Sequence, residues 1–248
     1  MFYAYLPRVP NVSRPKLYSG TRNASSWAMR AWLALRAAGI DFEEEIVDIR
    51  RPQRFANLKA VGRFSPPAMV PVLVVDGIAI YDSLAIMEYA NEVCGGRLMP
   101  AGLMQRAQAR SVLAWQHAGL SNTCARISFE SAFYPEKRAL TAIETSECER
   151  LFGVLARYLA DSGGPFLFGN LSLADLVLVP AIVRLVAHDP VVPSRDAIDA
   201  WMQALLAIAD VKEWMRNASV PPPIWSDEYL VPGQPIDLHI VPGPFDVA

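Results

Sequence analysis

Two short apolar runs in the first half of the chain predict a pair of strands joined by a tight turn. Val72–Val75 and Ile78–Tyr81 are rich in β-branched residues, and Asp76-Gly77 separates them. An Asp-Gly pair between two such runs favours a type I′ hairpin, because both central residues of that turn adopt positive φ. Asp82-Ser83 then precede an amphipathic run, which predicts a capped helix directly after the second strand.

The residues before this hairpin predict two further strands, each followed by a helix. Residues 16–19 and 42–49 are the strand candidates, and residues 27–38 and 52–61 are the helix candidates. The helix at 27–38 has Ala, Leu, Met and Trp on most of its faces, so we expect it to be buried. The element order is then β-α-β-α-β-β-α, with a parallel pair from the βαβ unit and an antiparallel pair from the hairpin. We therefore predict a mixed sheet of four strands.

Strand patterns stop after Gly95-Gly96, and helical periodicity follows. Residues 101–126 and 140–159 predict two helices, joined by an aromatic loop at 129–135. Ser172-Leu-Ala-Asp175 predicts a capping box before the apolar run 176–186, which is too short to span a bilayer and predicts a buried helix. The patterns predict an α/β domain followed by an all-α helical bundle, with an arm at 1–15, domains at 16–96 and 103–217, and a proline-rich strap at 218–248. The strap is apolar enough that we expect it to lie along the helical domain.

Composition and charge exclude several classes of function. The 248 residues are 52% hydrophobic with a net charge of −2 and no basic block, so no nucleic acid or membrane partner is expected. The cysteines lack metal-ligand or redox spacing, which predicts reduced structural thiols at Cys94, Cys124 and Cys148. The histidines are equally scattered, which predicts no metal site at His117, His188 or His239. The N-terminal residues lack the pattern of a secretory signal, so we expect a cytoplasmic protein.

The order of these pieces resembles the glutathione S-transferase superfamily. The resemblance rests on Val-Pro-Val-Leu at 70–73, the hairpin with its glycine turn, Asp-Ser-Leu-Ala-Ile at 82–86 and the Ser-x-x-Asp box of the helical domain. The run Asn-Ala-Ser-Ser-Trp at 23–27 is similar to the Ser-rich, Trp-containing signature of the zeta-like class and its bacterial relatives. The resemblance implies a thioredoxin-like first domain with a cis bond before Pro71, glutathione as cosubstrate without a metal, and a homodimer.

The resemblance also implies how the glutathione thiol is activated. The usual catalytic serine of the family falls on Asn23, which has no hydroxyl, so we expect Ser25, or else Ser26, to hydrogen-bond the sulfur. A free thiol has a pKa of about 8.5, and lowering it by two units needs about 2.7 kcal/mol. A hydroxyl hydrogen bond and a helix N-terminus together reach that order. If Ser25 acts on the sulfur, we expect Ser26 to cap the helix; the alternative is that both serines serve the helix start alone.

Three further contacts with glutathione are implied by the same resemblance. The backbone of Val70 would pair with the cysteinyl unit in a strand-like way. Ser83 and the helix amides would bind the γ-glutamyl carboxylate, and Asp82 would attract the ammonium group. The expected glutathione site consists of Asn23, Met69, Val70, Pro71, Asp82 and Ser83. Met69 stands where the family often has Gln or Lys, so Arg54 and Arg63 are candidates for binding the glycyl carboxylate.

The second substrate is expected to bind between the two domains. Its pocket candidates are Trp115, His117 and Phe133, with Phe129 and Tyr134 beside them. The expected function is transfer of glutathione to a small hydrophobic electrophile. One alternative is a zeta-like isomerase acting on an unsaturated diacid, which would need basic residues in this pocket. The other is a non-catalytic protein of the same fold that binds glutathione or another ligand.

Overall fold

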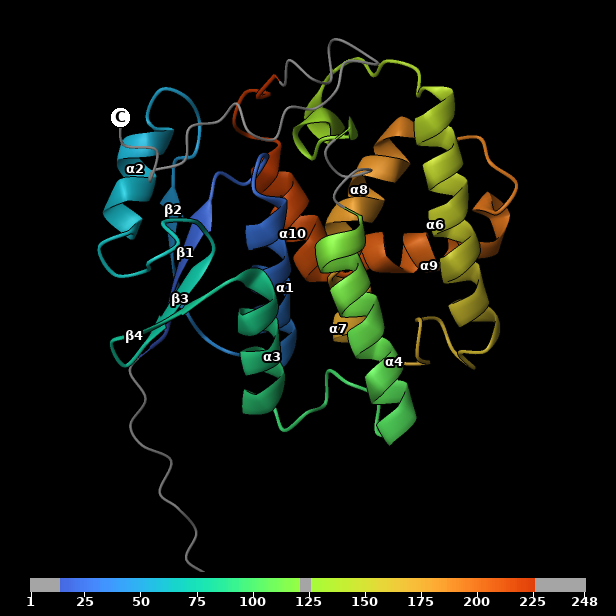
Figure 1. Ribbon diagram of the computed structural model, residues 1–248, viewed down its shortest axis with the longest axis horizontal. Helices are drawn as coiled ribbons and strands as arrows, with labels where there is room; N and C mark the ends of the chain where they lie inside the picture. Colours follow the sequence, from blue (N-terminus) through green and yellow to red (C-terminus); the bar gives the residue numbers. More distant parts are fainter. Residues whose placement is uncertain (1–13, 121–125, 226–248) are drawn as a thin grey trace, which may run out of the picture.

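The computed structural model describes residues 14–120 and 126–225, which form a four-stranded sheet with a group of helices beside it (Figure 1). The strand order is β2-β1-β3-β4. β1 (Lys16–Gly20) pairs in parallel with β2 (Glu43–Val47) and antiparallel with β3 (Val72–Val75). β3 also pairs antiparallel with β4 (Ile78–Tyr81). The predicted mixed sheet is confirmed.

Three helices belong to the sheet domain: α1 (Ser26–Ala38), α2 (Arg54–Val61) and α3 (Ser83–Val93). α1 and α3 pack side by side between the sheet and the helical domain, and α2 covers the opposite face (Figure 1). A small separate apolar cluster of Val47, Val61 and Val72 lies under α2. This is the order of elements that the sequence predicts, and it is thioredoxin-like.

The turns that connect these elements follow their sequence signals. Asp76 and Gly77 have φ of +49° and +80°, as a type I′ hairpin requires. Gly39 ends α1 in the left-handed conformation, at φ +74°, and its N–H bonds to carbonyls of the last helical turn. The Val70–Pro71 bond is cis, which is the isomer that the resemblance implies, and so is the Arg51–Pro52 bond.

The second domain is helical, and its regular helices are shorter than the sequence suggests. The predicted helix at 101–126 is wrong in extent: α4 ends at Ala114 and a π-helical turn, Trp115–Gly119, follows. The predicted buried helix at 176–186 is confirmed as α8, which begins later, at Val179, with Pro180 accommodated in its first turn because that position needs no N–H donor. The helices are α4 (Leu103–Ala114), α6 (Ala142–Ala160), α7 (Leu173–Leu176), α8 (Val179–His188), α9 (Arg195–Ala207) and α10 (Ala209–Ala218), with a 3₁₀ turn at Glu130–Phe133.

The predicted capping box at the start of α7 is confirmed. The Asp175 carboxylate accepts hydrogen bonds from the N–H of Ser172 at 2.9 Å and from its hydroxyl at 2.7 Å. The same carboxylate accepts from the N–H of Leu167 and from Nε1 of Trp201, each at 2.9 Å. Asp175 is fully buried, so this one side chain ties α7, the preceding loop and α9 together.

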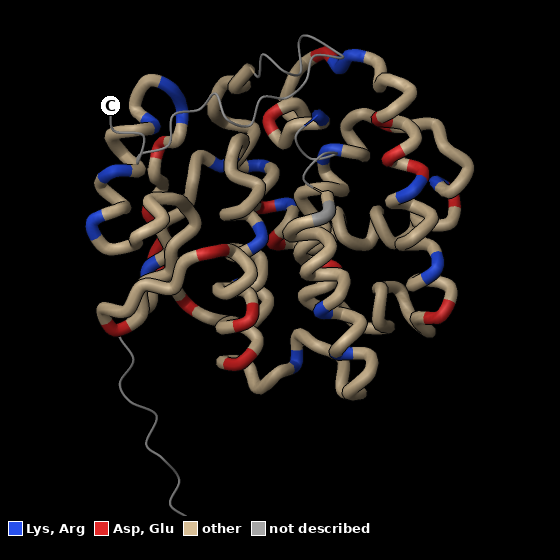
Figure 2. Tube along the Cα trace, in the orientation of Figure 1, with Lys and Arg blue, Asp and Glu red and all other residues tan. Residues whose placement is uncertain are grey.

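One hydrophobic core runs through both domains, and α1 lies at its centre. α1 contacts β1 and α3 on the sheet side and α7, α8 and α10 on the helical side. The rings of Trp32 on α1 and Trp214 on α10 meet edge to face, 5.6 Å apart. Positive and negative residues are interspersed along the described trace (Figure 2). None of the helices within residues 14–120 and 126–225 is both long and apolar enough to cross a membrane.

Candidate functional site

The loop between β1 and α1 places Ser25 beside Val70, the residue before the cis proline. The carbonyl of Thr21 accepts from the N–H groups of Ala24 at 2.9 Å and Ser25 at 2.8 Å, which closes a tight turn. A Cβ added to Gly20 would lie 2.6 Å from Cβ of Ser25 and 3.1 Å from Cγ2 of Val70. Only glycine fits there, and this close approach brings Ser25 next to Val70, the residue before the cis proline.

Ser25, not Ser26, is the helix cap, which corrects the predicted division of roles. The Ser25 Oγ accepts from the N–H of Ala28 at 3.3 Å, and its backbone is not helical, whereas Ser26 is the first helical residue. A capping hydroxyl uses a lone pair, so its proton can still be donated to another acceptor. Capping therefore leaves Ser25 able to hydrogen-bond a sulfur.

Ser26 has a different partner, from the other domain. The Arg184 guanidinium, on α8, donates from Nη2 to the Ser26 Oγ at 3.1 Å. Ser26 and Arg184 are each 5% exposed. The contact places a buried cation at the first turn of α1, and no periodic pattern predicts it because its two residues are far apart in the chain.

Asn23, which stands where the resemblance places the catalytic serine, is held by the C-terminal segment. Its Nδ2 donates to the carbonyl of Pro222 at 3.0 Å and, more weakly, to that of Pro221 at 3.4 Å. Its Oδ1 is buried and has no hydrogen-bond partner among the described residues. Because the donors face the two carbonyls, the remaining atom is an acceptor, and an acceptor does not stabilise a thiolate.

Asp82 and Ser83 lie at the start of α3, as the sequence predicts. Asp82 is the N-cap, with φ +74°, and its Oδ1 accepts from the N–H of Leu84 at 2.7 Å. Ser83 is 1% exposed, and within residues 14–120 and 126–225 its hydroxyl has no hydrogen-bond partner. A buried hydroxyl without a partner at a helix N-terminus is suited to bind a carboxylate.

His117, a predicted residue of the electrophile pocket, contacts Asp82 instead. Its Nε2 lies 3.5 Å from Oδ2 of Asp82, and its ring meets that of Trp27 edge to face at 5.1 Å. The Arg30 guanidinium lies 4.1 Å from the centre of the same Trp27 ring. His117 belongs to the π-helical turn Trp115–Gly119, which the helical pattern at 101–126 does not predict.

The remaining pocket candidates pack on other aromatic side chains and on the main core. Phe133 packs edge to face on the buried Phe129, with ring centres 5.4 Å apart, and Trp115 packs against the main core. Tyr134 is 1% exposed and contacts the C-terminal segment: its hydroxyl donates to the Ile224 carbonyl at 2.9 Å, and its ring stacks on Trp225 at 4.2 Å.

The two arginines proposed for the glycyl carboxylate differ in their surroundings. Arg63 is exposed, and Arg54 is half-buried at the start of α2. Burial raises the pKa of the Glu130 carboxyl, and the charges of Arg184 and Arg54 oppose that rise. Met69 is 59% exposed beside Val70, so a ligand could cover it.

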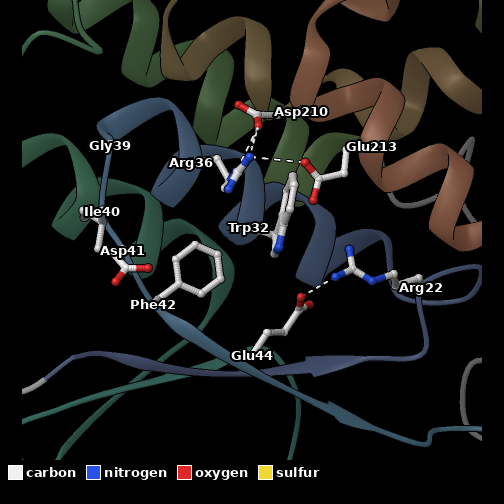
Figure 3. Close-up of a pocket in the computed structure, with 10 residues that line it drawn as sticks. All are labelled: Arg22, Trp32, Arg36, Gly39, Ile40, Asp41, Phe42, Glu44, Asp210 and Glu213. Atoms are coloured by element: carbon white, nitrogen blue, oxygen red, sulfur yellow. Dashed lines mark hydrogen bonds and ion pairs between the residues drawn. The ribbon is translucent and has the colours of Figure 1, made fainter.

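A cavity of about 440 Å³ lies elsewhere, between α1, β2 and α10 (Figure 3). Arg36 pairs there with Asp210 at 2.9 Å and Glu213 at 3.2 Å, and Arg22 pairs with Glu44. Burial raises the pKa of Glu44, and the charge of Arg22 opposes the rise. None of the predicted site residues lines this cavity. The ion pairs of Arg36 join the two domains, whereas the Arg22–Glu44 pair lies within the first.

The cysteines of the described residues are free thiols. Burial raises the pKa of the Cys148 thiol to about 12, so it stays protonated at neutral pH. Cys94 is a half-buried free thiol, and Cys124 lies outside the described residues. No cluster of three or more His, Cys, Asp or Glu side chains that could hold a metal ion occurs in the described part of the chain.

Comparison with known proteins gives the arrangement a family. The family model of the glutathione S-transferase N-terminal domain matches residues 24–93, and that of the C-terminal domain matches residues 102–215. Glutathione S-transferase 1 of Dianthus caryophyllus is 30% identical over 173 residues, which cover 68% of this chain and 76% of that protein. The chain belongs to the glutathione S-transferase family.

Two further relatives refine the comparison within the glutathione S-transferase family. Maleylacetoacetate isomerase of Mus musculus is 29% identical over 178 residues, covering 69% of this chain and 78% of that protein. A glutathione transferase homolog from Burkholderia, solved with bound glutathione, is 26% identical with a TM-score of 0.60, covering 83% of this chain and 97% of that one. The fold and the family agree with the resemblance in the sequence, and the relatives include both transferases and isomerases by name.

Proposed function

We propose that this glutathione S-transferase binds glutathione along Val70, Asp82 and Ser83 and activates its thiol through Ser25. The observation that carries the proposal is the position of the Ser25 hydroxyl, which caps α1, lies next to Val70 and retains a proton to donate. Asn23 directs its N–H groups to the C-terminal segment, so it does not compete for this role. The thiolate then attacks a small hydrophobic electrophile.

The energies are sufficient for this role. Lowering a thiol pKa from about 8.5 to about 6.5 needs about 2.7 kcal/mol. A hydrogen bond from a hydroxyl to a charged sulfur contributes about 1.5–3 kcal/mol. The N-terminus of α1 adds about 0.3–1 kcal/mol. In the reaction the thiol releases its proton to solvent, the thiolate forms a bond to the electrophilic carbon, and the leaving group departs with the electron pair.

Titration of bound glutathione tests the role of Ser25. Thiolate absorption near ~240 nm should show wild-type glutathione ionising below the pKa of the free thiol, and Ser25→Ala should raise that pKa by about one unit, or roughly 1.4 kcal/mol. Ser26→Ala is the matched control, because Ser26 is the adjacent buried serine and accepts from Arg184. A larger shift in Ser26→Ala than in Ser25→Ala would assign the sulfur contact to Ser26.

Glutathione binding should depend on Ser83. Ser83→Ala removes the only hydroxyl at the first turn of α3, so we expect glutathione affinity to fall by about 1.5–3 kcal/mol, the value of a hydrogen bond to a charged group. Calorimetry measures the change. The loss should come without a drop in stability, since Asp82 and not Ser83 caps the helix. An unchanged dissociation constant would remove Ser83 from the site.

A second candidate function is isomerisation of an unsaturated diacid. The observation that favours it is Arg184, a buried cation that reaches the first turn of α1 beside the two serines. A carboxylate substrate would find its charge partner there. The reaction would add the glutathione sulfur to a double bond, allow rotation and release glutathione again. A panel of aryl halides and cis-unsaturated diacids separates the two functions.

We also propose a homodimer formed by β4, α3 and α4. These elements expose large apolar side chains, namely Ile78 (68%), Tyr81 (46%), Val93 (54%), Leu103 (73%) and Met104 (72%). Exposed apolar groups on neighbouring elements mark an interface. Light scattering should give twice the monomer mass, and Leu103→Glu with Met104→Glu should halve it. Val191→Glu, at a residue that is 94% exposed, is the control. A wild-type monomer would contradict the proposal.

The domain limits at 16–96 and 103–217 and a cytoplasmic location belong to the same proposal. The link between Val93, where α3 ends, and Leu103, where α4 begins, supports the boundary. Cell fractionation tests the location.

A further inference from the structure

The C-terminal segment Ser219–Trp225 connects the two domains beside the proposed thiol site. It leaves the end of α10 and, in Figure 1, runs as the red end of the described chain past the start of α1. The Pro222 carbonyl accepts from Asn23 in the first domain. The Ile224 carbonyl accepts from Tyr134 in the second. The strap is predicted to lie along the helical domain, and its described part contacts the first domain as well.

The bridge between those two contacts is short. Pro222 and Ile224 are two residues apart, and an extended chain spans at most about 3.6 Å per residue, so the two carbonyls are separated by no more than about 7 Å. Asn23 lies two residues before Ser25, in the same loop. Tyr134 follows the 3₁₀ turn Glu130–Phe133. The segment therefore lies between the start of α1 and the aromatic group of the helical domain, where the sequence places the second substrate.

The segment is suited to hold a fixed position. Pro221-Pro222-Pro223 favours polyproline II, a stiff conformation without internal hydrogen bonds, and its carbonyls are available to Asn23. At the other end, the Trp225 ring stacks on the buried Tyr134 with planes 29° apart. A stacked aromatic pair adds to the hydrogen bond of the Tyr134 hydroxyl.

We propose that Pro221–Trp225 forms a barrier at the electrophile side of the glutathione site and that Trp225 and Tyr134 determine the size of the second substrate. The proposal rests on the proposed function, because it takes Ser25 as the thiol site. On this proposal a small group on the glutathione sulfur leaves the segment in place. A bulky group has to displace the segment. The affinity of the conjugate that carries it therefore falls by the free energy of the contacts that the segment loses.

Binding of two glutathione conjugates tests the barrier without requiring catalysis. S-methylglutathione carries a small group on the sulfur and S-(diphenylmethyl)glutathione a bulky one, and calorimetry gives both affinities for the full chain. Trp225→Ala should raise the affinity for the bulky conjugate about tenfold relative to that for the small one, which is the upper value for a stacked pair. Tyr134→Phe, which removes one hydroxyl, should give about fivefold. Tyr158→Phe is the matched control, since that ring packs on Phe168 instead.

The outcomes separate this inference from the proposed function. If the wild type binds neither conjugate, the glutathione site itself is wrong and the barrier falls with it. If both conjugates bind and their affinity ratio is unchanged in Trp225→Ala and Tyr134→Phe, the barrier is wrong and the glutathione site stands. Weaker binding of the bulky conjugate to Trp225→Ala would also contradict the proposed barrier, because Trp225 would then contact the ligand favourably.

Discussion

Asp175→Ala is expected to lower the free energy of unfolding by about 3–5 kcal/mol, because several buried donors lose their acceptor at about 1 kcal/mol or more each. The carboxylate accepts four hydrogen bonds, and all four donors would stay buried without a partner. Burial raises the pKa of Asp175, and the four donors oppose that rise. For a chain of this size the loss corresponds to a melting temperature lower by roughly 6–20 °C.

Calorimetric melting of Asp175→Ala and of Asp161→Ala checks this expectation. Asp161 is an exposed aspartate at the end of α6, so its removal should change the melting temperature by no more than about 2 °C. Asp175→Asn should fall between the two, since an amide keeps one acceptor oxygen and turns its nitrogen toward a donor. Equal melting temperatures of Asp175→Ala and Asp161→Ala would contradict the stabilising role of the Asp175 hydrogen bonds.

Arg184→Met should destabilise the protein by about 3 kcal/mol and raise the pKa of bound glutathione. The Arg184 guanidinium, from the helical domain, donates a hydrogen bond to Ser26. Its removal takes a buried positive charge away from the first turn of α1. Arg184→Lys keeps the charge but cannot reproduce the fork of donors, so it should recover the thiol pKa better than the stability. Arg157→Met, at an exposed arginine of α6, is the control.

The loss in Arg184→Met should depend on pH. Burial raises the folded-state pKa of Glu130, and Arg184 opposes the rise, so the variant should raise that pKa further. A carboxyl with a raised folded-state pKa favours the folded state when protonated, and that advantage is lost as pH increases from its unfolded value of about 4.3 through the folded value. Urea unfolding should therefore show a smaller deficit at acid than at neutral pH. An equal deficit at both would show that Glu130 is not coupled to Arg184.

Local signals predicted most of the fold. The Asp76-Gly77 turn, the Asp82 cap and the Ser172–Asp175 box each depend on residues within a few positions of one another, so the sequence contains the whole interaction. The extent of the helix after Leu103 was not predictable in the same way. Residues 115–119 keep a helical composition, and the π-helical turn follows from how they pack against other elements.

The site was predictable in position and less so in its partners. Val70, Asp82 and Ser83 belong to local motifs, so the sequence places them beside the cis proline and at the start of α3. The contacts of Ser26 with Arg184 and of Asn23 with Pro222 join residues more than 150 positions apart, and no periodicity encodes such pairs. The cap is Ser25 and not Ser26 for a local reason, because the capping residue is set by where the backbone becomes helical.

The burial of α1 has a consequence for how the chain can be divided. This helix belongs to the sheet domain by sequence, yet α7, α8 and α10 cover its other side, and Trp32 packs on Trp214. An isolated fragment that ended before Leu103 would expose that apolar side to water, and the remaining helices would lose the surface around which they assemble. The two domains that the sequence predicts should therefore fold as one unit and melt in a single cooperative transition. Replacing one of them alone with the domain of a relative should destabilise the protein.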